Sequence, residues 1–204
     1  ELRARIDDGK TPELIGNSAV MRKIRQSIER IAPTASRVLI NGPSGSGKEL
    51  AARTIHSQSD RRQEQFVVAN CARLSTERVD AELFGAESLQ SHRRVVGLFE
   101  QAHRGTLYFD EICDLPLETQ GKIVRAVNEQ RFRRVGGNSE VVVDVRVISA
   151  SSRDLSLEIS AGRLREDLYY RLGVVPLSMP PLAHRSEDIP VLAKYFTNRI
   201  VKHV

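Results

Sequence analysis

The chain has 204 residues, of which 40% are hydrophobic and 28% charged, and its formal net charge at pH 7 is +5. This length suffices for one α/β domain, or for one domain with part of a second, and the composition is that of a globular protein with a buried core. Because no segment reaches the roughly 18 apolar residues of a membrane span and the first ten residues lack the apolar core of a signal peptide, we expect a cytoplasmic protein without membrane contact.

Helical periodicity appears near both ends of the chain. Residues 1–12 are polar and end at Thr11-Pro12, so we expect them to be the tail of a linker from an upstream domain. The stretch "SAVMRKIRQSIERIA" then predicts an amphipathic helix capped by Ser18. Its expected apolar face consists of Val20, Ile24, Ile28 and Ile31. After Pro180-Pro181, "SEDIPVLAKYFTNRIVKHV" predicts one further helix.

Five short apolar runs lie between these helices. They occupy residues 37–40, 66–70, 106–111, 145–151 and 174–179, separated by helical or irregular segments. Continuous apolar strands alternating with helices indicate a parallel sheet covered on both faces. The predicted fold class is therefore α/β, with ligands expected at the carboxyl ends of the strands.

The segment "NGPSGSGKEL", residues 41–50, follows the first predicted strand. Its glycines at 42, 45 and 47 permit a tight curl in which backbone N–H groups point at an anion, and the helix predicted from Lys48 to about Ser57 adds its positive end. Lys48 would reach the terminal phosphates of a nucleotide. Considered alone, the pattern also fits an ordinary glycine-rich turn. Glu49 occupies the position where the commonest form of this loop has Ser or Thr.

The run "TLYFDE" supplies the acidic partner that such a loop needs. Asp110 and Glu111 end the third strand, where one carboxylate would hold Mg²⁺ through water and the other would polarise an attacking water. The alternative is an ordinary strand end that caps the next helix. The two segments together favour ATP hydrolysis.

Taken with "FVVANCARL", "AELFG", "FRRVGG" and "GRLREDLYYRLGVVPLSMPPL", these segments resemble the central AAA+ ATPase domain of bacterial enhancer-binding proteins, the activators of sigma-54 RNA polymerase. The resemblance runs from about Leu14 to the end of the chain. It implies a P-loop AAA+ three-layer sandwich with a five-stranded parallel sheet in residues 13–181 and the start of a truncated helical lid in 182–204, behind a linker (1–12) from a missing receiver domain. It also accounts for Glu49, because this family has GKE.

The resemblance implies a role for each site residue. Ile15 and Gly16 would line the adenine pocket of ATP or ADP. Asp110 would hold Mg²⁺ through water, with Glu49 as a second residue of the metal site, and Glu111 would activate water. The residues assigned to nucleotide binding in and after the loop are Gly42, Pro43, Ser44, Gly45, Ser46, Gly47, Lys48, Glu49 and Leu50.

Three further residues are assigned to control of hydrolysis. Asn70 would hold Glu111 away from water until a partner is engaged; the alternative is an Asn that caps a turn. Arg165 and Arg171 would reach the γ-phosphate of the neighbouring subunit, so hydrolysis would require a ring of six or seven copies. The alternative for Arg165 is an ion pair with Glu166 or Asp167.

The sequence departs from the family in a loop that normally contacts sigma-54. Residues 86–96, "AESLQSHRRVV", lack the GAFTGA motif and are polar and basic. This change argues against contact with sigma-54 and leaves another RNA polymerase contact open. With "RFRRVGG", the loop is most similar to the NtrX group of nitrogen-regulatory two-component response regulators, which carry a receiver domain before this segment and a helix-turn-helix DNA-binding domain after it. Ser152 stands where the family usually has Asn, a shorter side chain for sensing the γ-phosphate.

The leading hypothesis is an ATP-binding and hydrolysing domain whose turnover depends on assembly and is weakened by the truncated lid. A second hypothesis is a nucleotide-gated oligomerisation module with little turnover, and a third is a full sigma-54 activator with an altered loop. The basic clusters are short and contain few aromatic residues, so we expect no direct DNA binding by this segment. Cys71 and Cys113 are expected to be buried and reduced.

Overall fold

The computed structural model describes residues 13–88 and 94–201. Its centre is a five-stranded parallel sheet with the strand order β2-β5-β8-β1-β9. The strands are β1 (Val38–Asn41), β2 (Phe66–Asn70), β5 (Thr106–Asp110), β8 (Arg146–Ser151) and β9 (Val175–Ser178). Each of the five apolar runs in the sequence thus forms one strand of the sheet, which confirms the predicted α/β fold class. The expected linker at residues 1–12 lies outside the described residues.

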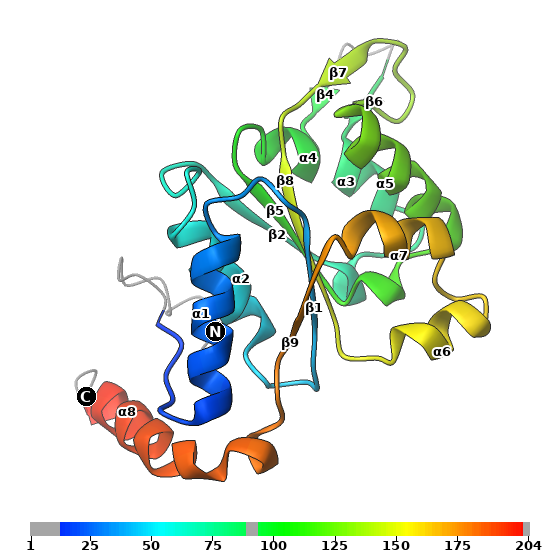
Figure 1. Cartoon of the computed structure of the whole chain (residues 1–204). Coiled ribbons are helices and arrows are strands. Elements are labelled where there is room, and N and C mark those ends of the chain that lie inside the picture. Colours follow the sequence, from blue (N-terminus) through cyan, green and yellow to red (C-terminus); the bar gives the residue numbers. More distant parts are fainter. Residues whose placement is uncertain (1–12, 89–93, 202–204) are drawn as a thin grey trace.

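Helices cover both faces of this sheet, so the domain has three layers (Figure 1). One face carries α1 (Ala19–Ile31) and α2 (Lys48–Ser57), and the other carries α3 (Val79–Phe84), α4 (Leu98–Gln101), α5 (Leu117–Glu129) and α7 (Glu166–Leu172). The remaining helices are α6 (Leu155–Ser160) and α8 (Ile189–Val201). Short 3-10 segments occupy Cys71–Arg73 (η1), Ile112–Asp114 (η2) and Leu182–Asp188 (η3). The predicted C-terminal helix is therefore divided between η3 and α8.

Strand β5 shows why the sequence of a central strand is apolar throughout. Leu107 and Phe109 face the cluster beneath α5 and α7, whereas Tyr108 faces the cluster beneath α1 and α2, and all three are fully buried. Both faces of a sheet between two helical layers must be apolar, so no polar alternation appears. Cys71 and Cys113 are buried free cysteines of the cluster beneath α5 and α7, as expected.

Helix α1 begins where the sequence predicted it. The Ser18 hydroxyl accepts a hydrogen bond from the Met21 amide, which satisfies one free N–H of the first turn. The helix buries Ile24, Ile28 and Ile31 as expected. The expected contribution of Val20 is wrong in part: Val20 is only half-buried, and the neighbouring Met21 is fully buried in its place.

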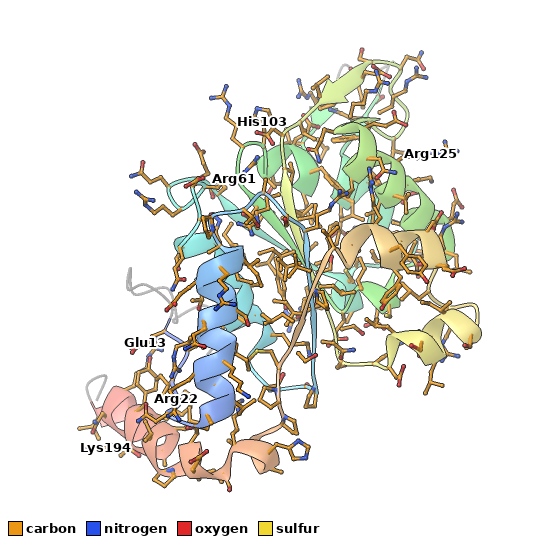
Figure 2. The ribbon with its side chains drawn as sticks, in the orientation of Figure 1. Glu13, Arg22, Arg61, His103, Arg125 and Lys194 are labelled. Carbon is orange, nitrogen blue, oxygen red and sulfur yellow. The ribbon has the colours of Figure 1, made fainter. Side chains whose placement is uncertain are left out.

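Arginines tie the amino-terminal edge of the sheet to the helices. Arg146, at the start of β8, is buried and donates to the carbonyl oxygens of Ala32 (2.7 Å) and Ile31 (3.0 Å) at the end of α1. Arg61 donates to the carbonyl oxygens of Gly105 and Asp144. Arg61 and His103 mark this edge in Figure 2. These bonds lie at the edge opposite the carboxyl ends of the strands, where ligands of such sheets bind.

Two small hairpins pack together at one end of the domain (Figure 1). The first pairs β3 (Ala86–Glu87) with β4 (Arg94–Val95), and the second pairs β6 (Arg131–Arg133) with β7 (Glu140–Val142). Arg134 joins the hairpins to α4 through a bidentate ion pair with Glu100, with both N···O distances at 2.8 Å. The strands β3 and β4 contain residues 86–87 and 94–95 of the loop that lacks GAFTGA, and residues 89–93 of that loop lie outside the described part.

Substitution of Glu100 by Gln should make stability less dependent on pH. Burial raises the pKa of Glu100, but hydrogen bonds from Arg134 and Arg94 outweigh burial and hold it below its ordinary value. The depressed pKa contributes stability at neutral pH that is lost as the pH falls through the folded-state value. We expect Glu100→Gln to lower the free energy of unfolding by about 2 kcal/mol at neutral pH and by less as acidity increases. Urea unfolding at neutral pH and across the acidic range measures this change, with Glu118→Gln, at an exposed glutamate, as the control. A loss of unfolding free energy that is equal at every pH would contradict the expectation.

Candidate functional site

The loop between β1 and α2 has the curled backbone that the sequence predicted. Gly45 and Gly47 have φ angles of 76° and 101°, in the left-handed region that favours glycine. Gly42 lies against the end of β9, where an added Cβ would be 2.4 Å from the Met179 carbonyl oxygen. A Cβ on Gly45 would meet nothing within 4 Å, so the tip of the loop faces open space.

Lys48, the first residue of α2, folds back into this loop. Its side chain is 7% exposed, and its Nζ donates to the carbonyl oxygens of Gly42 (3.0 Å) and Pro43 (3.4 Å). The same Nζ lies 3.2 Å from Glu111 Oε1. The structure therefore brings together the glycine loop and the acidic pair, which are about sixty residues apart in the sequence.

Asp110 and Glu111 end β5 beside that lysine. Burial raises the pKa of Asp110, and the negative charges of Glu111 and Glu49 raise it further, against the Tyr108 hydrogen bond and the charge of Lys48, which lower it. The Tyr108 hydroxyl donates to Asp110 Oδ1 at 3.1 Å. A cation placed at these carboxylates would relieve their mutual repulsion.

Glu111 is bound by Ser152, the residue after β8, as well as by Lys48. Its Oε2 accepts hydrogen bonds from the Ser152 backbone N–H (2.8 Å) and from the Ser152 hydroxyl (3.0 Å). Its φ is 56°, a left-handed conformation that costs a non-glycine residue about 1 kcal/mol or more. Ser152, which the sequence left as a doubtful sensor, thus contacts the proposed water-activating carboxylate.

Asn70 ends β2 and pairs in register with Asp110. Within residues 13–88 and 94–201 its side chain makes no hydrogen bond, so neither a hydrogen bond to Glu111 nor the alternative of a side-chain cap is present. The controlling role assigned to Asn70 stays a prediction.

The proposed Mg²⁺ residues suit an ion that keeps most of its water. The described residues contain no group of three or more His, Cys, Asp or Glu side chains that could hold a metal. Mg²⁺ in nucleotide sites uses one or two protein carboxylates together with waters and phosphate oxygens, so Asp110 fits such a site. Glu49 is exposed and pairs with Arg53 one turn further along α2, an arrangement that engages one of its carboxylate oxygens, Oε1 (2.9 Å).

The proposed adenine segment precedes α1. Gly16 has a φ of 140°, and an added Cβ would lie 2.7 Å from Asp188 Oδ2. Ile15 is half-buried beside it.

The remaining residues of the phosphate loop differ in exposure. Pro43 and Ser44 are exposed, whereas Ser46 is buried and its hydroxyl has no partner among the described residues. Leu50 packs partly against the core of α1 and α2.

Within residues 13–88 and 94–201, Arg165 and Arg171 make no hydrogen bond or ion pair to the phosphate loop of their own chain. Arg165 is exposed and forms a bidentate ion pair with Asp167, at 3.0 and 2.8 Å. This is the alternative that the sequence left open for Arg165. Arg171 is half-buried at the end of α7, and its Nε has no partner within the described residues.

A cavity of about 440 Å³ lies at the carboxyl ends of β1 and β8, beside the phosphate loop. Gly42, Pro43, Ser152 and Tyr169 are among the residues that line it. Ser152 had been considered only as a doubtful sensor of the γ-phosphate, and Tyr169 was not predicted as a site residue, because nothing in its local sequence indicates the contact.

Comparison with known proteins identifies the family. A model described as the Sigma-54 interaction domain matches residues 14–178, most of the chain. The chain belongs to the sigma-54 interaction domain family. This assignment confirms the resemblance derived from the sequence. None of the helices in the described ranges has the length and hydrophobicity to span a bilayer.

Response regulators are among the most similar relatives of this sigma-54 interaction domain. It is 52% identical over 187 residues to the nitrogen assimilation regulatory protein NtrX of Azorhizobium caulinodans, covering 92% of this chain and 41% of the relative. It is 45% identical over 190 residues to the response regulator protein PilR of Pseudomonas aeruginosa, covering 92% and 43%. The chain thus spans less than half the length of these relatives.

Solved structures agree with this assignment. NtrX from Brucella abortus in complex with ATP superimposes with a TM-score of 0.88 at 49% identity, covering 98% of this chain and 46% of that one. Its complex with ADP gives 0.89. The P-loop NTPase domain of an Escherichia coli sigma-54 activator gives 0.57 at 20% identity over 82% of this chain and 99% of that one, which supports the AAA+ fold alone.

Proposed function

We propose that this sigma-54 interaction domain binds ATP and ADP through residues 42–48 and hydrolyses ATP within an NtrX-like two-component transcriptional regulator. The observation that carries the proposal is the contact of Lys48 with Glu111 inside the glycine loop. The structures of a relative with ATP and with ADP support the choice of nucleotide.

In the proposed reaction, the loop amides and Lys48 hold the phosphates, while Ile15 and Gly16 contact the base. Mg²⁺, when bound, would neutralise charge on the phosphate oxygens, with Asp110 holding it through water and Glu49 nearby. Glu111 accepts the proton of the attacking water, whose oxygen bonds to the γ-phosphorus as the bond to the bridging oxygen breaks, giving ADP and phosphate.

In the structure both carboxylate oxygens of Glu111 are engaged, by Lys48 and Ser152. Glu111 must therefore be released before it can act.

The release of Glu111 and the stabilisation of charge on the γ-phosphate are assigned to a second copy of the chain. Arg165 would leave Asp167, and with Arg171 would reach the neighbouring subunit's γ-phosphate in a ring of six or seven copies. Asn70 is the proposed relay to Glu111. In this scheme residues 13–181 form the nucleotide-binding part and residues 182–204 begin the helical lid.

The full-length regulator is proposed to act in the cytoplasm with a receiver domain and a helix-turn-helix domain that binds DNA, and this segment itself makes no DNA contact. Because residues 86–96 lack GAFTGA, contact with sigma-54 is not part of the proposal, while another RNA polymerase contact is compatible with it. Failure of sigma-54 to bind a complex with an ATP transition-state analogue would support this choice.

A nucleotide-gated oligomerisation module is the second candidate function. The double restraint on Glu111 favours it, because a carboxylate with both oxygens engaged is a poor base for water. Binding of ATP or ADP would then set self-association with little turnover.

Phosphate release per subunit, measured against protein concentration, tests the proposal. We expect turnover to rise with concentration for the wild type and to stay low for Arg165→Ala, because Arg165 acts only between subunits. Arg165 is exposed, so its removal should leave the melting temperature unchanged. Absence of turnover at every concentration, with nucleotide binding intact, would favour the oligomerisation module instead.

A further inference from the structure

The segment η3, between β9 and α8, contacts both ends of the proposed nucleotide site. It passes next to the start of α1 and leads directly into α8 (Figure 1). Two of its residues, Arg185 and Asp188, are buried although they are charged, with 7% and 0% exposure. Buried charges require specific partners, so these two side chains are positioned by what they bind.

Arg185 contacts the phosphate loop from outside. Its Nη2 donates to the Ser46 carbonyl oxygen at 2.8 Å, and its Nη1 lies 3.2 Å from the Met21 sulfur on α1. Arg185 has φ and ψ angles of −142° and 43°, which interrupt the helical geometry of η3. The Ser46 carbonyl is thereby bound to a guanidinium, which makes stronger hydrogen bonds than a neutral donor.

This bond fixes the direction of the Gly47 amide. The peptide unit is planar and trans, so the Ser46 C=O and the Gly47 N–H point in opposite directions. With the carbonyl held by Arg185, the Gly47 N–H points away from Arg185 and α1. In the described part of the chain this N–H donates to no other group, and it stands at the N-terminus of α2, where anions bind.

Asp188 holds the other end of the site. Its carboxylate accepts hydrogen bonds from the Asn17 N–H (2.6 Å), the Ser18 N–H (2.8 Å) and the Ser18 hydroxyl (2.6 Å). Burial raises the pKa of Asp188, but these bonds and the charge of Arg185 outweigh burial and lower it, so the group is ionised. The turn after Gly16, beside the proposed adenine segment, is therefore held in one conformation.

We propose that η3 is a strap that sets nucleotide affinity, in which Arg185 orients the Ser46–Gly47 peptide toward the phosphates and Asp188 fixes the turn beside the base. Arg185 is a positioning residue for the phosphate loop. The inference rests on the proposed binding of ATP and ADP. Since α8 begins at the residue after Asp188, the strap also joins that helix to both ends of the site.

Calorimetry with ATP and ADP on the 204-residue chain tests the strap. We expect Arg185→Gln to bind both nucleotides about tenfold more weakly, the loss that one misdirected, charge-assisted contact produces. Arg146→Gln is the matched control, because Arg146 is also a buried arginine bound to backbone carbonyls, at the opposite edge of the sheet. It should lose stability and keep the wild-type affinity.

A second readout separates positioning from folding. In a ¹H–¹⁵N spectrum of the ADP complex, the Gly47 amide should shift in Arg185→Lys, whose single ammonium cannot hold the carbonyl at the same place, and the affinity should fall by less than in Arg185→Gln. If Arg185→Gln does not fold, the nucleotide affinity and the Gly47 amide shift of Arg185→Lys test the proposal instead. An unchanged Kd together with an unmoved Gly47 amide in a folded Arg185 variant would overturn the strap. Failure of the wild type to bind either nucleotide would instead overturn the proposed function.

Discussion

Replacement of Lys48 by alanine should weaken the binding of ATP and ADP by about 100-fold or more. The variant loses the only basic side chain that the structure places inside the glycine loop, within the described residues. It also leaves Glu111 without its cationic partner, so a negative charge then faces the phosphates. The two changes act in the same direction, and calorimetry with ATP and with ADP measures their sum.

Lys122→Ala is the matched control for this experiment. Lys122 is also paired with carboxylates, those of Asp80 and Glu118, but it lies on α5 and has no contact with the loop. Its replacement should leave both affinities at the wild-type value. Equal affinities for the wild type and Lys48→Ala would show that the nucleotide, if bound, is not held by this loop.

Glu111→Gln should reduce ATP turnover by a factor of about 10² to 10⁴ while ATP binding is retained. The amide has the size of the carboxylate and can still accept the Ser152 hydrogen bonds through its oxygen, but it cannot take a proton from water. Removal of a negative charge beside the phosphates should keep the affinity for ATP at or above the wild-type value. Phosphate release at saturating ATP, combined with calorimetry, measures the two effects separately.

Ser152→Ala serves as the comparison for Glu111→Gln. It removes the hydroxyl bond to Glu111 and keeps both the bond from the Ser152 backbone N–H and the contact with Lys48, so one of the three restraints on Glu111 is lost. Its turnover should change by less than about tenfold, because the base itself is intact. Wild-type turnover in Glu111→Gln would assign water activation to another group.

Local sequence was sufficient to predict the sheet and the loop. Each strand is an uninterrupted apolar run because both of its faces are covered, and such runs are visible without knowledge of the partner strand. The glycines of the loop and Lys48 are likewise adjacent in the chain, so their curl follows from local backbone freedom. The sequence also predicted correctly that the end of β5 lies beside the loop, since parallel strands end at a common edge.

The contacts of the site that were not predicted from the sequence join residues that are far apart in the chain. Ser152 and Glu111 are 41 residues apart, Arg185 and Ser46 are 139 apart, and Asp188 and Ser18 are 170 apart. No periodicity or short motif indicates such a pairing. Val20 was placed in the core instead of Met21 because two neighbouring apolar residues at a helix start satisfy the helical period almost equally well.

The close approach of Gly42 to Met179 has a mechanical consequence for the loop. An added methyl group at residue 42 would collide with backbone and side-chain atoms of residue 179, so the first turn of the loop rests directly on the end of β9. Two prolines follow this strand and lead toward α8. Displacement of the chain beyond residue 179 is therefore transmitted to the base of the loop by contact between uncharged atoms, a route that dissolved salt does not screen.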